Sequence, residues 1–331
     1  MRFRLRSLLW WCVLVLLAVG VAGTWWASRP LDLPAPLEFT VAPGSGAYAV
    51  GGALADAGVP VSPVLFAALA RLTGQASRLK AGSYAADPAS TPWSLLDKIA
   101  RGAVLQFSLV IPEGWTVAQM RAAMAANRNL KSTLAEAGEA EILAAIGATE
   151  RRLEGLFFPD TYLFPCGTPD LEILRRAYRA QQQRLAGAWA ERAPDLPLRS
   201  PYEALILASI VEKETGRAAD RAHVAAVFLN RLRIGMPLQT DPTVIYGLGA
   251  RFDGNLRKQH LLADNPYNTY TRKGLPPTPI ALPGLAALAA TLHPAASDAL
   301  YFVARGDGSS AFSTNLDDHN RAVNRYQRRR P

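Results

Sequence analysis

The stretch PYEALILASIVEKETGR, residues 201–217, carries the clearest secondary-structure signal in the larger part of the chain. Pro201 suits the first position of a helix and Gly216 suits its end, so the stretch predicts a single helix. On a helical wheel, the apolar residues three, four and seven positions before Glu214 share its face, whereas Glu212 lies on the far side. Contact with apolar side chains should raise the pKa of Glu214, as a general acid near neutral pH requires. Glu214 is therefore the leading catalytic candidate.

A plainer interpretation of Glu214 stays open on this stretch alone. At the end of a helix, its side chain could stand in solvent or pair with Lys213 or Arg217. In either case Glu212 and Glu214 cannot act as one pair of carboxyl groups, because residues two apart on a helix do not face each other.

Two polar segments follow, at residues 227–249 and 266–284, and both are broken by glycine and proline. Their aromatic rings, amides and hydroxyls suit a carbohydrate, since rings stack on apolar sugar faces and amides reach sugar hydroxyls. The candidate binding residues are Asn230, Gln239, Thr240, Asp241, Tyr267 and Asn268. Each segment could equally be an ordinary loop. Residues 301–323 predict a β-hairpin that turns at Gly306–Gly308 beside the site.

The N-terminus predicts a membrane anchor. Residues 8–27 form an uncharged apolar run that is long enough for a helix to cross roughly 30 Å of hydrocarbon. The arginines of residues 1–7 should keep that tail in the cytoplasm and leave everything from Ser28 onward outside it. A cleaved signal peptide is the alternative. Signal peptides have a shorter apolar core, and Trp25 and Trp26 stand where small residues would be needed.

The rest of the chain divides into a linker and two units. Residues 28–36 contain three prolines and predict an extended linker. Residues 37–110 mix strand-like and helix-like segments, which predicts a small α+β module with a binding or spacing role. Residues 111–331 predict a larger mixed α+β domain whose loops, after Leu238, would surround a site. The predicted fold class is α+β.

Composition excludes several classes of function. Half of the 331 residues are hydrophobic and 19% are charged, so the chain can bury a core. The net charge of +9 lies mostly in arginines at the two ends, including Arg328–Arg330, so we expect no nucleic-acid partner. Cys12 would lie in the bilayer and Cys166 outside the cytoplasm, so they cannot pair. The four histidines are isolated and phosphate-binding loops are absent from the sequence, so we expect neither metal nor cofactor.

Five motifs, taken in order, give the chain a family resemblance. They are LEGLFFPDTYLF at 153–164, LASIVEKET at 207–215, FLNRLRIGMPLQTDPTVIYGLG at 228–249, YNTYTRKGLPPTPIALPG at 267–284, and YFVA with FSTNLDDHN within 301–320. Together with the single N-terminal anchor, they resemble the endolytic murein transglycosylase family, also called MltG/YceG-like. The similarity covers most of residues 110–327 and, more loosely, residues 37–110.

The resemblance implies cleavage of nascent peptidoglycan strands at the outer face of the inner membrane. The cut would fall between N-acetylmuramic acid and N-acetylglucosamine, leave 1,6-anhydro ends and stop strand elongation. Residues 37–110 would be a LysM-like module, and peptidoglycan synthases are candidate partners. The family's catalytic glutamate falls in the EKET stretch, where the Glu-Thr pattern selects Glu214, followed by Thr215. The six polar candidates would hold the sugar.

Two other classes of function stay open. The chain could be a catalytically inert glycan-binding scaffold of the cell-wall synthesis complex. It could also be a glycoside hydrolase, inverting or retaining, that uses Glu214 with Asp160 or Asp241. In the transglycosylase a single carboxyl group suffices, so that function does not require Asp241.

Overall fold

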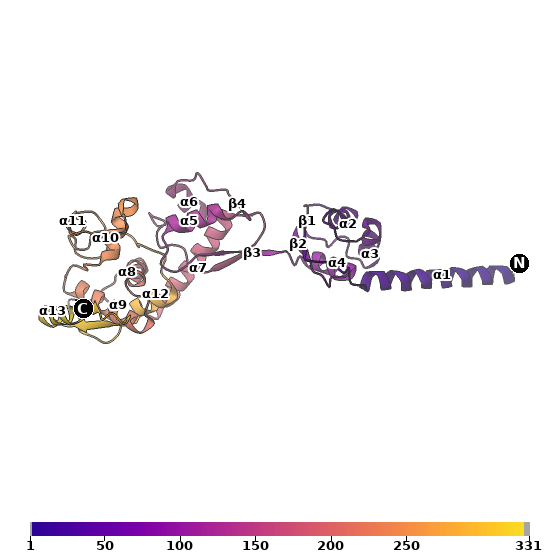
Figure 1. The fold of residues 1–331 in the computed structure, drawn as a ribbon. Coiled ribbons are helices and arrows are strands. Elements are labelled where there is room, and N and C mark those ends of the chain that lie inside the picture. The colour runs from indigo at the N-terminus through magenta and orange to yellow at the C-terminus, as the bar shows by residue number, and fades with distance from the viewer. Residues whose placement is uncertain (1, 328–331) are drawn as a thin grey trace. The chain divides into compact units, whose positions relative to one another are not determined.

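The computed structural model describes residues 2–327, which form two compact units (Figure 1). The first unit comprises the residues up to Phe107 together with Leu163–Thr168. The second comprises Ser108–Tyr162 and the residues from Pro169 onward. The predicted C-terminal tail, Arg328–Arg330, lies outside the described residues.

The chain begins with one long helix, α1 (Arg2–Ser28). Within it, Trp10–Ser28 has a mean hydropathy of 1.7 and is long and apolar enough to cross a membrane, as signal sequences near an N-terminus also are. The end of α1 belongs to the core of the first unit, because Ala27 is fully buried and Trp26 packs against the core residues. Just beyond it, the Leu31 N–H donates to the Ser90 carbonyl at 2.9 Å.

The first unit is a small α+β module, as predicted. Its elements are β1 (Leu37–Val41), α2 (Ala47–Asp56), α3 (Pro63–Leu72), β2 (Gly82–Ala86) and α4 (Pro92–Arg101). The two strands pair antiparallel, with Leu37 opposite Ala86 and Val41 opposite Gly82. Phe39 and Tyr84 stack across this pair at 5.7 Å, and the helices bury their apolar faces around them.

Two short strand pairs and three helices follow in the chain. The paired strands are β3 (Gln106–Val110) with β5 (Thr161–Pro165), and β4 (Leu130–Lys131) with β6 (Thr168–Pro169). The helices are α5 (Val117–Ala126), α6 (Glu139–Ile146) and α7 (Asp170–Ala190). Gly155, in the LEG motif, has a φ of +82°, and a Cβ atom there would lie 2.4 Å from Pro279. Only glycine fits that position without displacing the loop that carries Pro279.

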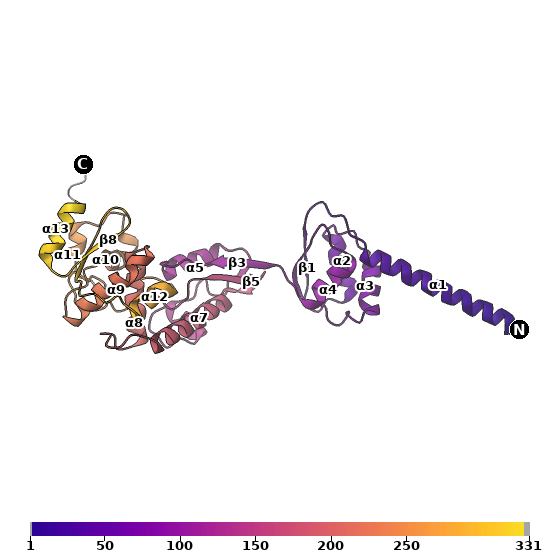
Figure 2. The ribbon, with the colours of Figure 1, turned by 90° about the horizontal axis from the view of Figure 1, so that it is seen from below.

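The centre of the second unit is α8 (Pro201–Glu214), the helix predicted from the opening stretch. Ser200 caps its first turn by accepting a hydrogen bond from the Glu203 N–H, and Pro201 follows at the first helical position. The wheel predicted an apolar stripe, but every residue of Ala204–Val211 is buried. The reason is that α8 packs against helices on several sides, namely α7, α9 (Ala218–Arg233), α10 (Asp241–Leu248) and α12 (Leu285–Leu292) (Figure 2).

The remaining elements are short. They are the 3₁₀ turn η1 (Gly249–Arg251), α11 (Lys258–Leu262), β7 (Tyr301–Ala304), β8 (Ser310–Ser313) and α13 (Leu316–Tyr326). The two strands form the predicted antiparallel hairpin, with Tyr301 opposite Ser313. Its turn is fixed by Asp307, whose carboxylate accepts the Ser309 N–H at 2.8 Å. The hairpin and α13 pack together and bring Tyr301 and His319 to the end of α8.

Candidate active site

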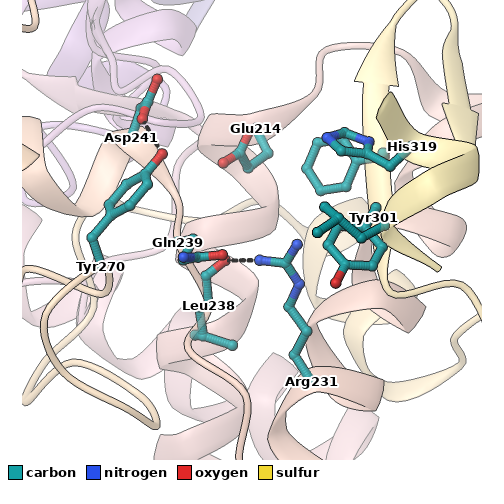
Figure 3. Close-up of a pocket in the computed structure, with 10 residues that line it drawn as sticks. Glu214, Arg231, Leu238, Gln239, Asp241, Tyr270, Tyr301 and His319 are labelled. Carbon is teal, nitrogen blue, oxygen red and sulfur yellow. Dashed lines mark hydrogen bonds between the residues drawn. The ribbon is translucent and has the colours of Figure 1, made fainter. Parts of the chain in front are cut away.

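A cavity of about 370 Å³ opens at the C-terminal end of α8 (Figure 3). Its walls come from segments that are far apart in the sequence, so it exists only in the folded second unit. The lining residues are Glu214, Arg231, Leu238, Gln239, Asp241, Tyr270, Tyr301, Phe302, Leu316 and His319. Polar and aromatic side chains dominate this list, as in a site that receives a carbohydrate.

Glu214 is the last residue of α8, and its carboxyl group lies at the cavity. The helix ends here because the backbone of Thr215 is extended. The Thr240 hydroxyl donates a hydrogen bond to Oε1 of Glu214. Burial raises the pKa of Glu214 and the charge of Asp241 raises it further, whereas the Thr240 hydrogen bond and the Arg231 charge lower it. A carboxyl group that holds its proton beside a cavity can act as a general acid.

Glu212 occupies different surroundings, although burial raises its pKa as well. Its Oε2 accepts the N–H of the buried Gly284 at 2.9 Å, and it does not line the cavity. The two glutamates of the EKET stretch therefore point to separate partners. The carboxyl group of Glu212 accepts a backbone hydrogen bond, whereas the carboxyl group of Glu214 faces the cavity.

Asp241 is the second carboxyl group at the cavity. It is the first residue of α10, immediately after Thr240. The Tyr270 hydroxyl donates to its Oδ1 at 2.6 Å (Figure 3). Burial raises the pKa of Tyr270, and its hydrogen bond to Asp241 and the nearby negative charges raise it further, so the phenol keeps its proton and remains a donor. This pair places a fixed negative charge near Glu214.

Arg231 is a cavity residue that the sequence analysis missed. It is 7% exposed, and its guanidinium donates to the carbonyl groups of Leu238 and Leu300, at 2.7 Å in each case. It also lies 5.3 Å from the ring centre of Tyr301. Arg231 therefore joins the segment before α10 to the hairpin, which fixes two walls of the cavity. The available signal was its spacing, because Arg231 comes four residues after the buried Val227 and three residues after the buried Phe228, which is the spacing of one helix face.

The hairpin and α13 add an aromatic wall. Tyr301 stacks on His319 with ring centres 5.1 Å apart. Burial lowers the pKa of His319 and the charge of Arg231 lowers it further, so the imidazole is neutral at pH 7. A neutral ring stacked on a phenol is a suitable surface for the apolar face of a sugar. This hairpin was predicted from the sequence to lie beside the site, with no role for either ring.

Three of the six predicted binding residues lie at the cavity or touch Glu214. Gln239 and Asp241 line it, and Thr240 binds the Glu214 carboxyl group. Gln239 has a φ of +50°, in the left-handed region, and its N–H donates to the Thr269 carbonyl at 3.1 Å. That sharp turn sends three consecutive residues to one end of α8.

The other three predicted residues have different partners. The Asn230 amide donates to the carbonyl groups of Ser297 and Ala299, at 2.7 and 3.0 Å. The fully buried Asn268 donates to the Ala263 carbonyl at 2.7 Å and holds its own loop. The Tyr267 hydroxyl shares a hydrogen bond with Thr278, and its ring lines a second cavity. None of the three lines the cavity at Glu214.

Asp160, the partner considered for a hydrolase, is also not among the residues that line the cavity. Its carboxylate lies 4.0 Å from the Arg184 guanidinium. Within residues 2–327, no three His, Cys, Asp or Glu side chains are grouped so that they could hold a metal ion.

Comparison with known proteins identifies relatives over nearly the whole chain. A sequence model of the YceG-like family matches residues 39–325. A protein of Bacillus subtilis named endolytic murein transglycosylase is 31% identical over 312 residues, which cover 89% of this chain and 86% of that protein. A Streptococcus pneumoniae protein of the same name is 28% identical and covers 94% of this chain, which spans 63% of its length. The crystal structure of a YceG-like protein from Listeria monocytogenes has a TM-score of 0.53 at 29% identity, covering 86% of this chain and 98% of that one.

Proposed function

The chain belongs to the YceG-like family, and we propose that it is a membrane-anchored murein transglycosylase that uses Glu214 as its acid and base. The curated relatives carry the name endolytic murein transglycosylase, which makes the chain a lyase of that class. The substrate we propose is a nascent glycan strand, cut between N-acetylmuramic acid and N-acetylglucosamine. The observation that carries the assignment of Glu214 is its position beside the cavity, with a raised pKa and one oxygen held by Thr240.

The reaction needs one carboxyl group that first gives and then takes a proton. Protonated Glu214 donates its proton to the glycosidic oxygen as the bond from that oxygen to C1 of the muramic acid breaks. The 6-hydroxyl of the same sugar then forms the new bond to C1. Glu214, now a carboxylate, accepts the hydroxyl proton. The enzyme is restored, no water is consumed, and the product ends in a 1,6-anhydro ring.

Asp241 and Tyr270 would stabilise charge during the reaction and would not themselves form or break bonds. The sugar carries positive charge as its glycosidic bond breaks, and a nearby carboxylate stabilises that charge. The same negative charge contributes to the raised pKa of Glu214, so it favours the protonated form needed at the start. The Tyr270 hydroxyl fixes the Asp241 carboxylate in position. Gln239, Tyr301 and His319, which line the cavity, would contact the sugar.

A glycoside hydrolase is the second candidate, because Asp241 lines the same cavity as Glu214. A hydrolase would use this second carboxylate as a base or a nucleophile, and its product would contain one water molecule more. Digestion of purified peptidoglycan by the wild-type protein, followed by mass spectrometry of the products, separates the possibilities. Anhydro ends support our proposal, and reducing ends would favour the hydrolase. If no product formed at all, the inert scaffold would be favoured.

We also propose that α1 is retained as an anchor, with both units on the extracytoplasmic side of the inner membrane. The packing of Trp26 and Ala27 into the first unit supports this, because cleavage after the apolar run would remove part of that core. Residues 37–110 would be a LysM-like glycan-binding module, and peptidoglycan synthases remain candidate partners. Membrane fractions washed with high salt test the anchor. The full-length protein should stay in the pellet, and a shorter protein in the soluble fraction would indicate a signal peptide.

A further inference from the structure

A second cavity of about 840 Å³ lies in the second unit. Its walls are formed by α5, α8, α10, the η1 turn and Tyr267, and Glu214 is not part of it. The apolar part of the wall includes Pro242, Ile245, Phe252 and Ile280. A cavity of this size, mostly apolar and with a few polar groups, is typical of a ligand-binding site.

The two cavities adjoin at two places along the chain. On α8, Lys213 lines the second cavity and Glu214 lines the first. At the start of α10, Asp241 lines the first cavity and Pro242 lines the second. Consecutive Cα atoms are about 3.8 Å apart, so the walls of the two cavities share a continuous backbone at the ends of both helices. A side branch on a polymer bound at Glu214 could therefore enter the second cavity.

The rim of the second cavity is cationic. The Lys213 ammonium donates to the Gly114 carbonyl at 3.2 Å, and the salt bridges within residues 2–327 do not include it. Arg152 contributes a second cation, although Glu139 lies 3.0 Å from its Nε and offsets much of that charge. The charge of Lys213, which also acts on the neighbouring Glu212, is therefore the main positive charge on this rim, and it favours a carboxylate.

The buried acid of this cavity does not cancel that charge. Glu154 is 7% exposed, and its two carboxyl oxygens accept the Val117 N–H and the Tyr246 hydroxyl, each at 3.0 Å. Burial raises its pKa to about 7, so at neutral pH it carries only part of a negative charge. With both oxygens engaged, Glu154 ties α5 to α10 and supports the wall. The cavity then combines apolar sides with a positive rim.

We propose that this second cavity binds the peptide stem of murein. The Lys213 ammonium would bind a stem carboxylate, and the methyl groups of the stem alanines would pack against Ile245 and Phe252. Each muramic acid unit carries such a stem, so a strand with that sugar at Glu214 has a short anionic branch beside the cut. This inference rests on the function proposed above and adds what the enzyme recognises next to the sugar.

Steady-state kinetics of the full-length protein test the inference on two substrates. One is a glycan strand with its stems, and the other is the same strand after an amidase has removed them. With the stems present, Lys213→Ala should raise KM about fivefold, as expected for one partly exposed charge-assisted contact, and leave kcat unchanged. On the stripped strand it should match the wild type. Lys131→Ala, an exposed lysine on β4, is the matched control and should behave as the wild type on both.

A second variant avoids α8 altogether. Ala118 is an exposed residue of α5 that lines the cavity, so Ala118→Trp should block it and also raise KM only for the strand with stems. Equal effects of both variants on the two substrates would overturn the inference in favour of a sugar-binding role. If the wild type forms no anhydro product, the proposed function fails separately. In that case, calorimetry with the isolated stem tetrapeptide still tests the inference. The wild type should bind the tetrapeptide, and Lys213→Ala should bind it about fivefold more weakly. If the wild type did not bind the tetrapeptide, the stem site would be contradicted.

Discussion

The last turn of α8 places Glu212 and Glu214 in contrasting surroundings. Burial raises the pKa of both. Glu212 accepts a backbone N–H from Gly284, whereas Glu214 stands at a cavity with Thr240 on one oxygen and Asp241 nearby. The comparison teaches that a raised pKa alone does not identify a catalytic acid. Both glutamates have charged neighbours, so access to the cavity is what distinguishes Glu214 from Glu212.

The largest expected effect comes from Glu214→Gln. The amide keeps the shape and can still accept from Thr240, but it cannot donate a proton to the glycosidic oxygen, so kcat should fall by at least about 100-fold. The midpoint of thermal unfolding in detergent should change little, because the change removes no buried partner. A variant that lost activity and also melted much earlier would mean that Glu214 serves the fold.

Asp241→Asn should have a smaller effect, with a distinctive pH dependence. Asp241 contributes to the raised pKa of Glu214, so removing its charge should lower that pKa. The acid form then disappears at a lower pH, and the alkaline limb of kcat/KM should move to lower pH. We expect the rate at neutral pH to drop roughly tenfold, on the order of 1.4 kcal/mol. An unchanged pH profile would remove Asp241 from the account.

Glu212→Ala should affect stability more than chemistry. The substitution leaves the N–H of the buried Gly284 without its partner, which typically costs about 1–3 kcal/mol. The thermal midpoint should fall, while kcat per folded molecule stays within a few-fold of the wild type. A fall in kcat comparable with that of Glu214→Gln would erase the distinction between the two glutamates.

Glu154 extends the comparison to a third buried acid, through the pH dependence of stability. Its pKa is raised to about 7 from an ordinary value of 4.5, so the folded state holds the proton more tightly than the unfolded state. The proton on Glu154 therefore stabilises the folded state fully below about pH 4.5. This stabilisation is lost as the pH rises through 7, and it amounts to at most about 3 kcal/mol. Thermal midpoints at pH 5 and pH 8 should differ more for the wild type than for Glu154→Gln. Equal differences would contradict the raised pKa.

Local sequence signals predicted α8 and the hairpin well. Pro201 predicted the start of the helix, where the structure adds the Ser200 cap, and the glycines around Asp307 predicted the turn of the hairpin. The environment of α8 was harder to predict. In LILASIV, residues 205–211, only Ser209 is polar, and all seven side chains are buried because helices pack on several sides of α8.

The candidate site was predictable in part, for a reason that Asn230, Asn268 and Arg231 illustrate. Composition correctly indicates polar loops. It does not distinguish an asparagine whose amide would bind a sugar from one whose amide holds a loop to a neighbouring carbonyl group. Asn230 and Asn268 do the latter. Arg231 was missed because a buried arginine depends on carbonyl groups from Leu238 and Leu300, one of them distant in sequence. The family resemblance suggested the reaction, and only the fold showed which residues surround Glu214.

The most direct test is a parallel digestion of purified peptidoglycan by the wild type, Glu212→Gln and Glu214→Gln. Mass spectrometry of the strand ends then reports the chemistry for two residues that share one helix turn. We predict 1,6-anhydro ends from the wild type and from Glu212→Gln, and none from Glu214→Gln. Anhydro ends that persist in Glu214→Gln, or that vanish only in Glu212→Gln, would contradict the assignment of Glu214 as the catalytic acid.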